Sequence, residues 1–153
     1  MEKLQQAAKI AFASEYTFYL NAHFFHWNVE GPDFSQLHEL FGNVYEEVYK
    51  SLDGFAERIR AIGAYAPGSY SRFSMLSRIE DETQVPRAEV MVQQLLQDSD
   101  NMVIILKRVY DVAEAAGEHG FSNFLAERMD AHRKHSWQLR ATTKWMSTKS
   151  FHT

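Results

Sequence analysis

Apolar residues recur three or four positions apart along most of the chain, and this spacing is typical of amphipathic α-helices. The apolar runs cover residues 4–29, 37–62, 92–113 and 121–146. The sequence shows no strand-like alternation, internal repeat or low-complexity segment. The pattern therefore predicts an all-α protein with four long helices.

Glycine and proline separate these predicted helices. Glu30-Gly31-Pro32 ends the first helix, and Gly63 ends the second. Pro86 suits the first turn of the third helix, where proline is favoured. Gly117 and Gly120 divide the third helix from the fourth. The second and third helices are therefore joined by a much longer connection than the other pairs.

This long connection contains one short apolar cluster, SYSRFSMLSRI at residues 69–79, which predicts a two-turn helix lying across the crossover. Four amphipathic helices with one long crossover are typical of a ferritin-like four-helix bundle rather than a simple up-and-down bundle. We expect residues 1–153 to form a single domain of this kind, since the length fits one domain.

Composition limits the chemistry. The chain has no cysteine, so disulfides, iron–sulfur clusters and thiolate zinc sites are excluded, and any metal must bind nitrogen and oxygen. The formal charge of −4 argues against a protein that mainly neutralises nucleic-acid phosphates. No apolar run is long enough for a signal peptide or a membrane span, so we expect a soluble, cytoplasmic protein.

The second predicted helix carries two carboxylates on one face, Asp53 and Glu57. At 100° per residue they lie about 145° and about 180° from the centre of the apolar stripe, and His38 lies about 85° from it. Such an acid pair is most often a solvated surface. Tyr45 and Tyr49 share this face, however, and indicate burial against another subunit.

A metal site inside a four-helix bundle usually needs Glu-x-x-His pairs, and this sequence contains none. If two copies pack antiparallel about a two-fold axis, His26 and His38 of one chain can meet Asp53 and Glu57 of the other. This nitrogen and oxygen set, with open positions, suits ferrous iron and an oxidant better than structural zinc. Either histidine alone is more often a helix-end or interface residue.

Four segments carry a resemblance to a known family: HFFHWNVEGPDF, LHELF, LDGFAERIRAIG and YAPGSY. They resemble the Dps-type miniferritins, the ferritin relatives named as DNA-binding proteins from starved cells, and the resemblance covers essentially the whole chain. It implies a hollow dodecamer that oxidises Fe(II), preferably with hydrogen peroxide, and stores the ferric mineral. It also implies ferroxidase centres at two-fold interfaces, with His26 and His38 from one subunit and Asp53 and Glu57 from its neighbour.

Two further positions bear on the implied site. Gly42 stands where the family usually has an aspartate, so we expect the second metal position to be weak, or completed by water or by Glu46. Trp27 resembles the tryptophan beside the family's iron centre. It can pack at the interface, supply an electron to oxidised intermediates with Tyr45 or Tyr49 as relays, or do both.

Other polar residues are less informative. His23 can support the site or belong to an aromatic helix end. His132 and His135 share a face of the fourth helix, which is a polar surface by default and a divalent-ion site as the alternative. Glu127 and Asp130 are candidates, by family analogy, for an acidic pore at a three-fold axis.

These observations favour an iron-oxidising storage cage, with two alternatives. A DNA-coating protein commonly uses a lysine-rich tail, but the termini offer only Lys3, Lys9, Lys144 and Lys149, so we expect DNA binding to be weak or absent. The third interpretation is a cage whose site is degraded at Gly42 and which acts as a scaffold or passive metal binder.

Overall fold

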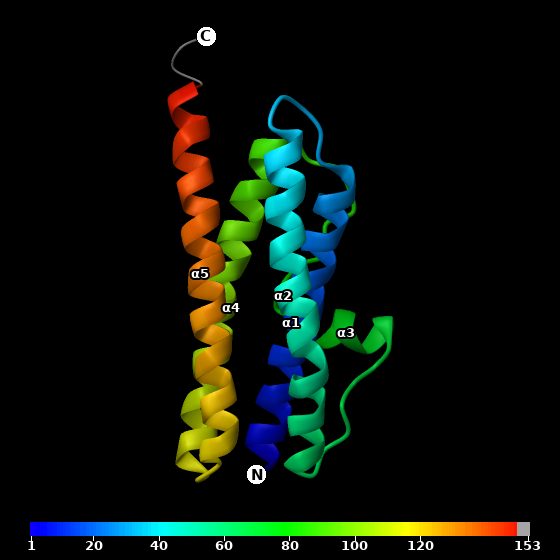
Figure 1. Cartoon of the computed structure of the whole chain (residues 1–153). Helices are drawn as coiled ribbons and strands as arrows, with labels where there is room; N and C mark the ends of the chain where they lie inside the picture. The colour runs from blue at the N-terminus through cyan, green and yellow to red at the C-terminus, as the bar shows by residue number, and fades with distance from the viewer. Residues whose placement is uncertain (150–153) are drawn as a thin grey trace.

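The computed structural model describes residues 1–149, with side chains through residue 143. Its helices are α1 (Glu2–Asn28), α2 (Phe34–Ala61), α3 (Tyr70–Leu76), α4 (Ala88–Ala115) and α5 (His119–Lys149). The four long helices run side by side as a bundle, and α3 lies across its outside (Figure 1). The predicted all-α bundle with a short crossover helix is confirmed. The side chains of Lys144 and Lys149, two of the terminal lysines, lie outside the described range.

The observed helix ends lie close to the predicted breaks. Gly31, with φ of 116°, and Gly117, with φ of 75°, adopt backbone conformations that favour glycine. Two boundaries differ from the prediction. Pro86 precedes the third long helix, which begins at Ala88. Gly120 lies in the first turn of α5 rather than ending a helix, because a glycine near a helix start costs little of the helical hydrogen bonding.

Aromatic rings fill the bundle core and hold α3 in place. The Phe55 ring lies 5.6 Å from Phe12 of α1 and 5.3 Å from Phe124 of α5, measured between centroids. Phe73 of α3 packs edge-on against Phe12 at 5.8 Å. Full burial of such rings contributes about 1.5–3 kcal/mol each. The core thus packs α1, α2, α3 and α5 against one another.

The crossover returns the chain along the bundle, so that α4 runs in the same direction as α2 (Figure 1). The Asn21 side chain ties the crossover to α1: its Nδ2 donates to the Glu80 carbonyl, and its Oδ1 accepts from the Glu82 amide. Among the described residues, no helix combines the length and the apolar character that crossing a membrane requires.

Candidate functional site

His26 and His38 face each other across the loop between α1 and α2. The His26 Nδ1 lies 2.6 Å from the His38 carbonyl oxygen, and the His38 Nδ1 lies 2.7 Å from the His26 carbonyl oxygen. The two rings stack with centroids 3.7 Å apart. A carbonyl oxygen only accepts, so each Nδ1 carries the proton. In the neutral imidazole this leaves the Nε2 lone pair of both rings available.

Gly42 lies against this histidine pair. It is buried in α2, and a Cβ at this position would lie 3.1 Å from both Cε1 and Nδ1 of His26. The absence of a side chain therefore lets the His26 ring lie directly on the α2 backbone. Gly42 lacks a ligand atom, as the sequence shows, but the structure adds a role that sequence alone did not reveal: it makes room for a histidine.

Asp53 and Glu57 lie on the solvent side of α2, away from the bundle core, as helical spacing predicts. The pKa of the Glu57 carboxyl is raised, first by a hydrogen bond with Asp53 and then by the negative charge of Asp53. The Asp53 carboxylate thus disfavours the ionised form of Glu57, and a bound cation would relieve that repulsion.

The histidine pair and the carboxylate pair are far apart within one chain. Asp53 follows His38 by fifteen residues along α2, which corresponds to about 22 Å at the rise of an α-helix. Within the part of the chain that the structure describes, no three His, Asp or Glu side chains gather into a metal-binding group. The structure of one chain therefore brings the predicted residues together as two pairs, not as one site.

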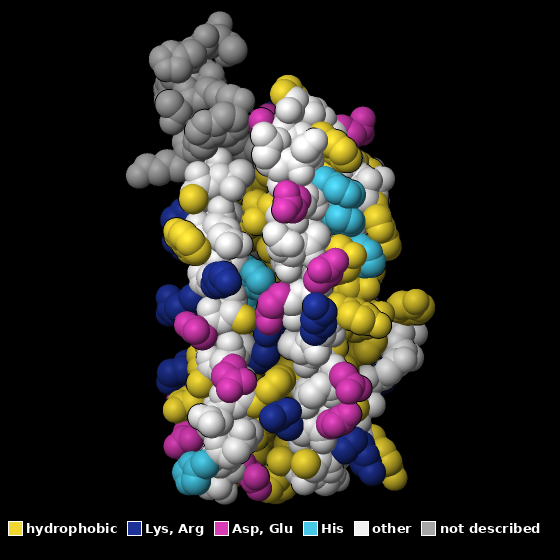
Figure 2. Space-filling model, viewed as in Figure 1, with side chains coloured by type: hydrophobic (Ala, Val, Ile, Leu, Met, Phe, Trp, Pro, Cys, Tyr) yellow, Lys and Arg dark blue, Asp and Glu magenta, His cyan; other side chains and the backbone are white. Residues whose placement is uncertain are grey.

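Exposed aromatic side chains surround these residues. Trp27 is 59% exposed and Tyr49 is 58% exposed, although both are large and hydrophobic. Figure 2 shows hydrophobic and histidine side chains gathered on the side of the bundle where α1, α2 and α3 lie. Contiguous apolar surface of this kind commonly marks a protein interface.

His23 sits at the centre of an aromatic cluster that sequence reasoning did not resolve. Its ring stacks on Tyr45 with centroids 3.8 Å apart and contacts the Trp27 ring at 4.0 Å. The Tyr19 hydroxyl lies 3.0 Å from His23 Nδ1. Burial, and then the neighbouring His26, lower the pKa of His23. The i, i+4 spacing of Tyr19 and His23 was the available sequence signal.

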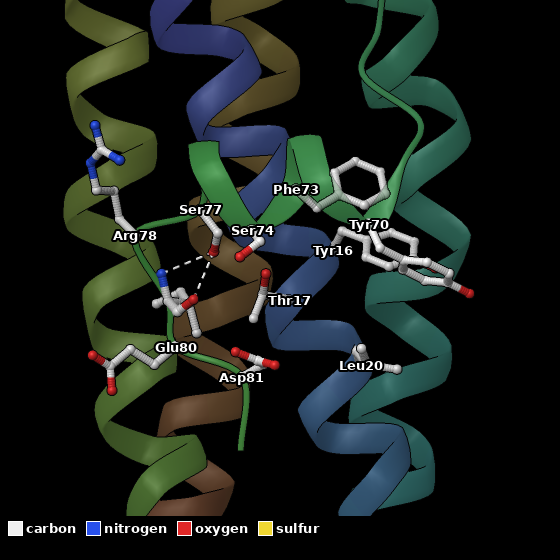
Figure 3. Close-up of a pocket in the computed structure, with 11 residues that line it drawn as sticks. Tyr16, Thr17, Leu20, Tyr70, Phe73, Ser74, Ser77, Arg78, Glu80 and Asp81 are labelled. Atoms are coloured by element: carbon white, nitrogen blue, oxygen red, sulfur yellow. Dashed lines mark hydrogen bonds between the residues drawn. The ribbon is translucent and has the colours of Figure 1, made fainter. Parts of the chain in front are cut away.

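A groove of about 560 Å³ continues this surface beside α3. Figure 3 shows the rings of Tyr16 and Phe73 side by side in its wall, and their centroids are 4.3 Å apart. Tyr16 also contacts Tyr19 at 5.6 Å. The aromatic cluster around His23 therefore extends to the groove.

A second polar cluster lies inside the bundle. Arg128 of α5 bonds Glu15 of α1 through Nε at 3.1 Å and Glu47 of α2 through Nη2 at 3.1 Å. His132 Nε2 bonds Glu15, and His135 Nε2 lies 2.8 Å from Glu47. Burial alone would raise the pKa of Glu47, but hydrogen bonds from His135 and Arg128 hold it at about 2.

The expectation that His132 and His135 lie on a polar helix face is wrong. Both are buried, and their Nε2 atoms bond the carboxylates of Glu15 and Glu47. The sequence could have indicated this cluster through Glu15, an acidic residue that lies between Ala11 and Phe18 on the apolar stripe of α1. Other candidates behave as surface residues: Glu46, Glu127 and Asp130 are exposed.

A model of the ferritin-like domain matches residues 6–147 of the chain. The DNA protection during starvation protein 2 of Bacillus anthracis is 34% identical over 119 residues, which cover 78% of this chain and 82% of that protein. The chain belongs to the Dps family of ferritin-like proteins.

Solved Dps structures share this fold closely. The Dps protein from Bacillus brevis has 30% identity and a TM-score of 0.88, covering 92% of this chain and 95% of that one. Dps from Staphylococcus aureus has 27% identity and a TM-score of 0.89, covering 94% and 96%. The ferritin-like bundle and its crossover helix are therefore those of the Dps family.

Proposed function

We propose that this chain is a subunit of a closed cage that oxidises Fe(II) with hydrogen peroxide and stores the ferric product. His26 and His38 of one subunit bind the iron together with Asp53 and Glu57 of a second subunit. The observation that carries the proposal is the reciprocal bonding of the two histidines, which leaves both Nε2 atoms without a hydrogen-bond partner among the described residues, beside the exposed ring of Trp27.

The donor set fits Fe(II) as a substrate. Histidine ligands usually donate their second ring N–H to a carbonyl or carboxylate, which fixes the tautomer and the ring orientation. His26 and His38 already have this arrangement. Two imidazole nitrogens and two carboxylates with open positions suit ferrous iron and leave room for peroxide.

Two observations support the proposed placement between subunits: a distance and the state of the bundle interior. His38 and Asp53 are about 22 Å apart along one α2 helix, and His26 lies beside His38, so one chain cannot join the two pairs. An antiparallel pair about a two-fold axis can, and it would also cover the exposed rings of Trp27 and Tyr49. Inside the bundle, the carboxylates of Glu15 and Glu47 already bond Arg128. We further propose that such pairs assemble into a dodecamer in the cytoplasm.

The proposed reaction removes Fe(II) and peroxide together. Two Fe(II) ions each give one electron, the O–O bond of hydrogen peroxide breaks, and two protons complete two water molecules. Gly42 supplies no ligand, so we propose one firm iron position and a second that is weaker, completed by water or by Glu46. Trp27 then supplies an electron when only one iron is bound.

Stopped-flow oxidation of Fe(II) by peroxide tests this proposal. Replacing His26, Asp53 and Glu57 by alanine should slow oxidation by at least about tenfold, because each removes a ligand. Glu89→Ala, an exposed carboxylate of α4, is the control and should leave the rate unchanged. Oxidation that is unaffected in the ligand variants would overturn the mechanism.

A second function is DNA protection, which the name of the Bacillus anthracis relative raises. The formal charge of −4 supports at most weak binding at physiological salt. A gel-shift assay at low and at physiological salt separates the two functions, and tight retention at the higher salt would favour DNA coating.

The scaffold alternative is tested by counting the iron atoms bound per site in crystals soaked anaerobically in Fe(II). A count of zero would favour the scaffold.

A further inference from the structure

Tyr19, His23 and Trp27 lie on one face of α1, four residues apart, and form a connected row. The Trp27 ring contacts His23 with centroids 4.0 Å apart. On the other side of that imidazole, the Tyr19 hydroxyl lies 3.0 Å from Nδ1. A single imidazole ring therefore separates the Trp27 indole, which follows the candidate ligand His26 in the sequence, from the hydrogen-bonded phenol of Tyr19.

We propose that Tyr19 is an electron donor to oxidised Trp27, and that His23 Nδ1 accepts the phenolic proton as the electron leaves. The inference rests on the proposed function, which supplies the oxidising equivalents through Fe(II) and hydrogen peroxide. It adds to that function Tyr19 as the first phenol to take up the oxidising equivalent from Trp27. None of the four proposed iron ligands is among the described partners of Tyr19, which acts through Trp27 and His23.

The hydrogen bond selects Tyr19 over its neighbour Tyr45. A phenol that loses an electron becomes a strong acid, so its oxidation requires a base within hydrogen-bond reach, about 2.6–3.2 Å. Tyr19 has such a base in His23 Nδ1 when the ring proton is on Nε2, the tautomer that the proposed step requires. Tyr45 stacks on the face of the same imidazole, and its hydroxyl has no hydrogen-bond partner among the described residues.

The step balances when only one Fe(II) is bound. Hydrogen peroxide takes one electron from Fe(II) and one from Trp27, its O–O bond breaks, and two protons from solvent complete two water molecules. Tyr19 then returns the electron to Trp27: its O–H bond breaks, the proton binds His23 Nδ1, and a neutral phenoxyl radical remains. Fe(II) becomes Fe(III), and no free hydroxyl radical is released.

Tyr19 also contacts further tyrosine rings on the side away from Trp27. Its ring contacts Tyr49 at 5.2 Å and Tyr16 at 5.6 Å, and Tyr16 lines the groove beside α3 (Figure 3). The row therefore moves the oxidising equivalent from the iron ligands to a set of phenols that can share it.

Pulse radiolysis of the iron-free, assembled protein tests the step without relying on ferroxidase activity. Azide radicals at neutral pH oxidise indole in preference to phenol. In a W137F/W145F background, Trp27 is the single remaining tryptophan of the chain. We expect the indole radical to decay as a phenoxyl radical appears. Y19F should slow this transfer by at least about tenfold, and H23Q should slow it with Tyr19 in place.

The matched control is Y45F, which removes a hydroxyl and keeps the ring stacked on His23; the surface variant Y65F controls for a distant phenol. In both variants the electron should move to the Trp27 radical at the same rate as in the W137F/W145F protein. An unchanged rate in Y19F, or loss of transfer in Y45F, would overturn the inference. Because no iron is present, a failed ferroxidase proposal leaves this result unaffected, and the reverse holds as well.

Discussion

Two pairs of histidines in this chain are used in opposite ways. His26 and His38 bond backbone carbonyls through Nδ1 and keep Nε2 free on a half-buried surface. His132 and His135 are buried in the bundle and bond carboxylates through Nε2. The two pairs have the same residue type and differ in the partner of Nε2. That partner, rather than residue type or spacing, distinguishes a candidate metal ligand from a histidine that belongs to a structural ion network.

The largest effect should come from the interior cluster. Arg128→Met removes the guanidinium that neutralises Glu15, which is fully buried. Losing one partner of a buried ion pair costs about 3–5 kcal/mol, and here it leaves His132 as the remaining described partner of the buried Glu15 carboxylate. Urea unfolding measures the loss. A cost below about 1 kcal/mol, the level of a surface pair, would show that the cluster is not structural.

The two histidine pairs should separate when metal affinity and stability are measured on the same variants. We expect H26A and H38A to lower the affinity for Co²⁺, a stand-in for Fe(II), by at least about tenfold, with little change in stability. H135A should do the reverse, because it removes one of the two partners of the partly buried Glu47 and leaves only Arg128. H119A, an exposed histidine of α5, is the control for both readouts. Equal metal affinity in H26A and H135A would contradict the comparison.

The smallest effect concerns two glycines of α2. A Cβ at Gly54 would meet the end of the flexible Arg58 side chain at 3.3 Å, whereas at Gly42 it would meet the His26 ring at 3.1 Å. G54A should therefore stabilise the protein by about 0.5–1 kcal/mol. G42A should stabilise the protein less than G54A does, and it should weaken Co²⁺ binding, since the His26 ring must move. Thermal unfolding with and without Co²⁺ checks both, and identical behaviour of the two variants would contradict the role given to Gly42.

The fold was predictable because it rests on periodicity. The apolar stripes and the breaks at Gly31 and Gly63 placed four long helices, and the cluster around Phe73 located the short one. The outward position of Asp53 and Glu57 followed from the same arithmetic, because the rotation per residue is fixed within a single helix.

Contacts between helices were not predictable in the same way. The bond between Glu15 and Arg128 joins residues more than one hundred positions apart, and it depends on how α1 and α5 pack. The closeness of Gly42 to His26 depends on the angle between α1 and α2. An acidic residue on the apolar stripe, as at Glu15, indicates that a buried partner exists but does not say which one.

The central claim is that each site takes histidines from one chain and carboxylates from another, and mixed assembly tests it most directly. The chains H26A/H38A and D53A/E57A are each expected to be inactive alone. When they assemble together, one of the two sites in every mixed pair receives all four native side chains. Random mixing should then restore Fe(II) oxidation at about one quarter of the sites. Mixed assemblies as inactive as either parent would contradict the account.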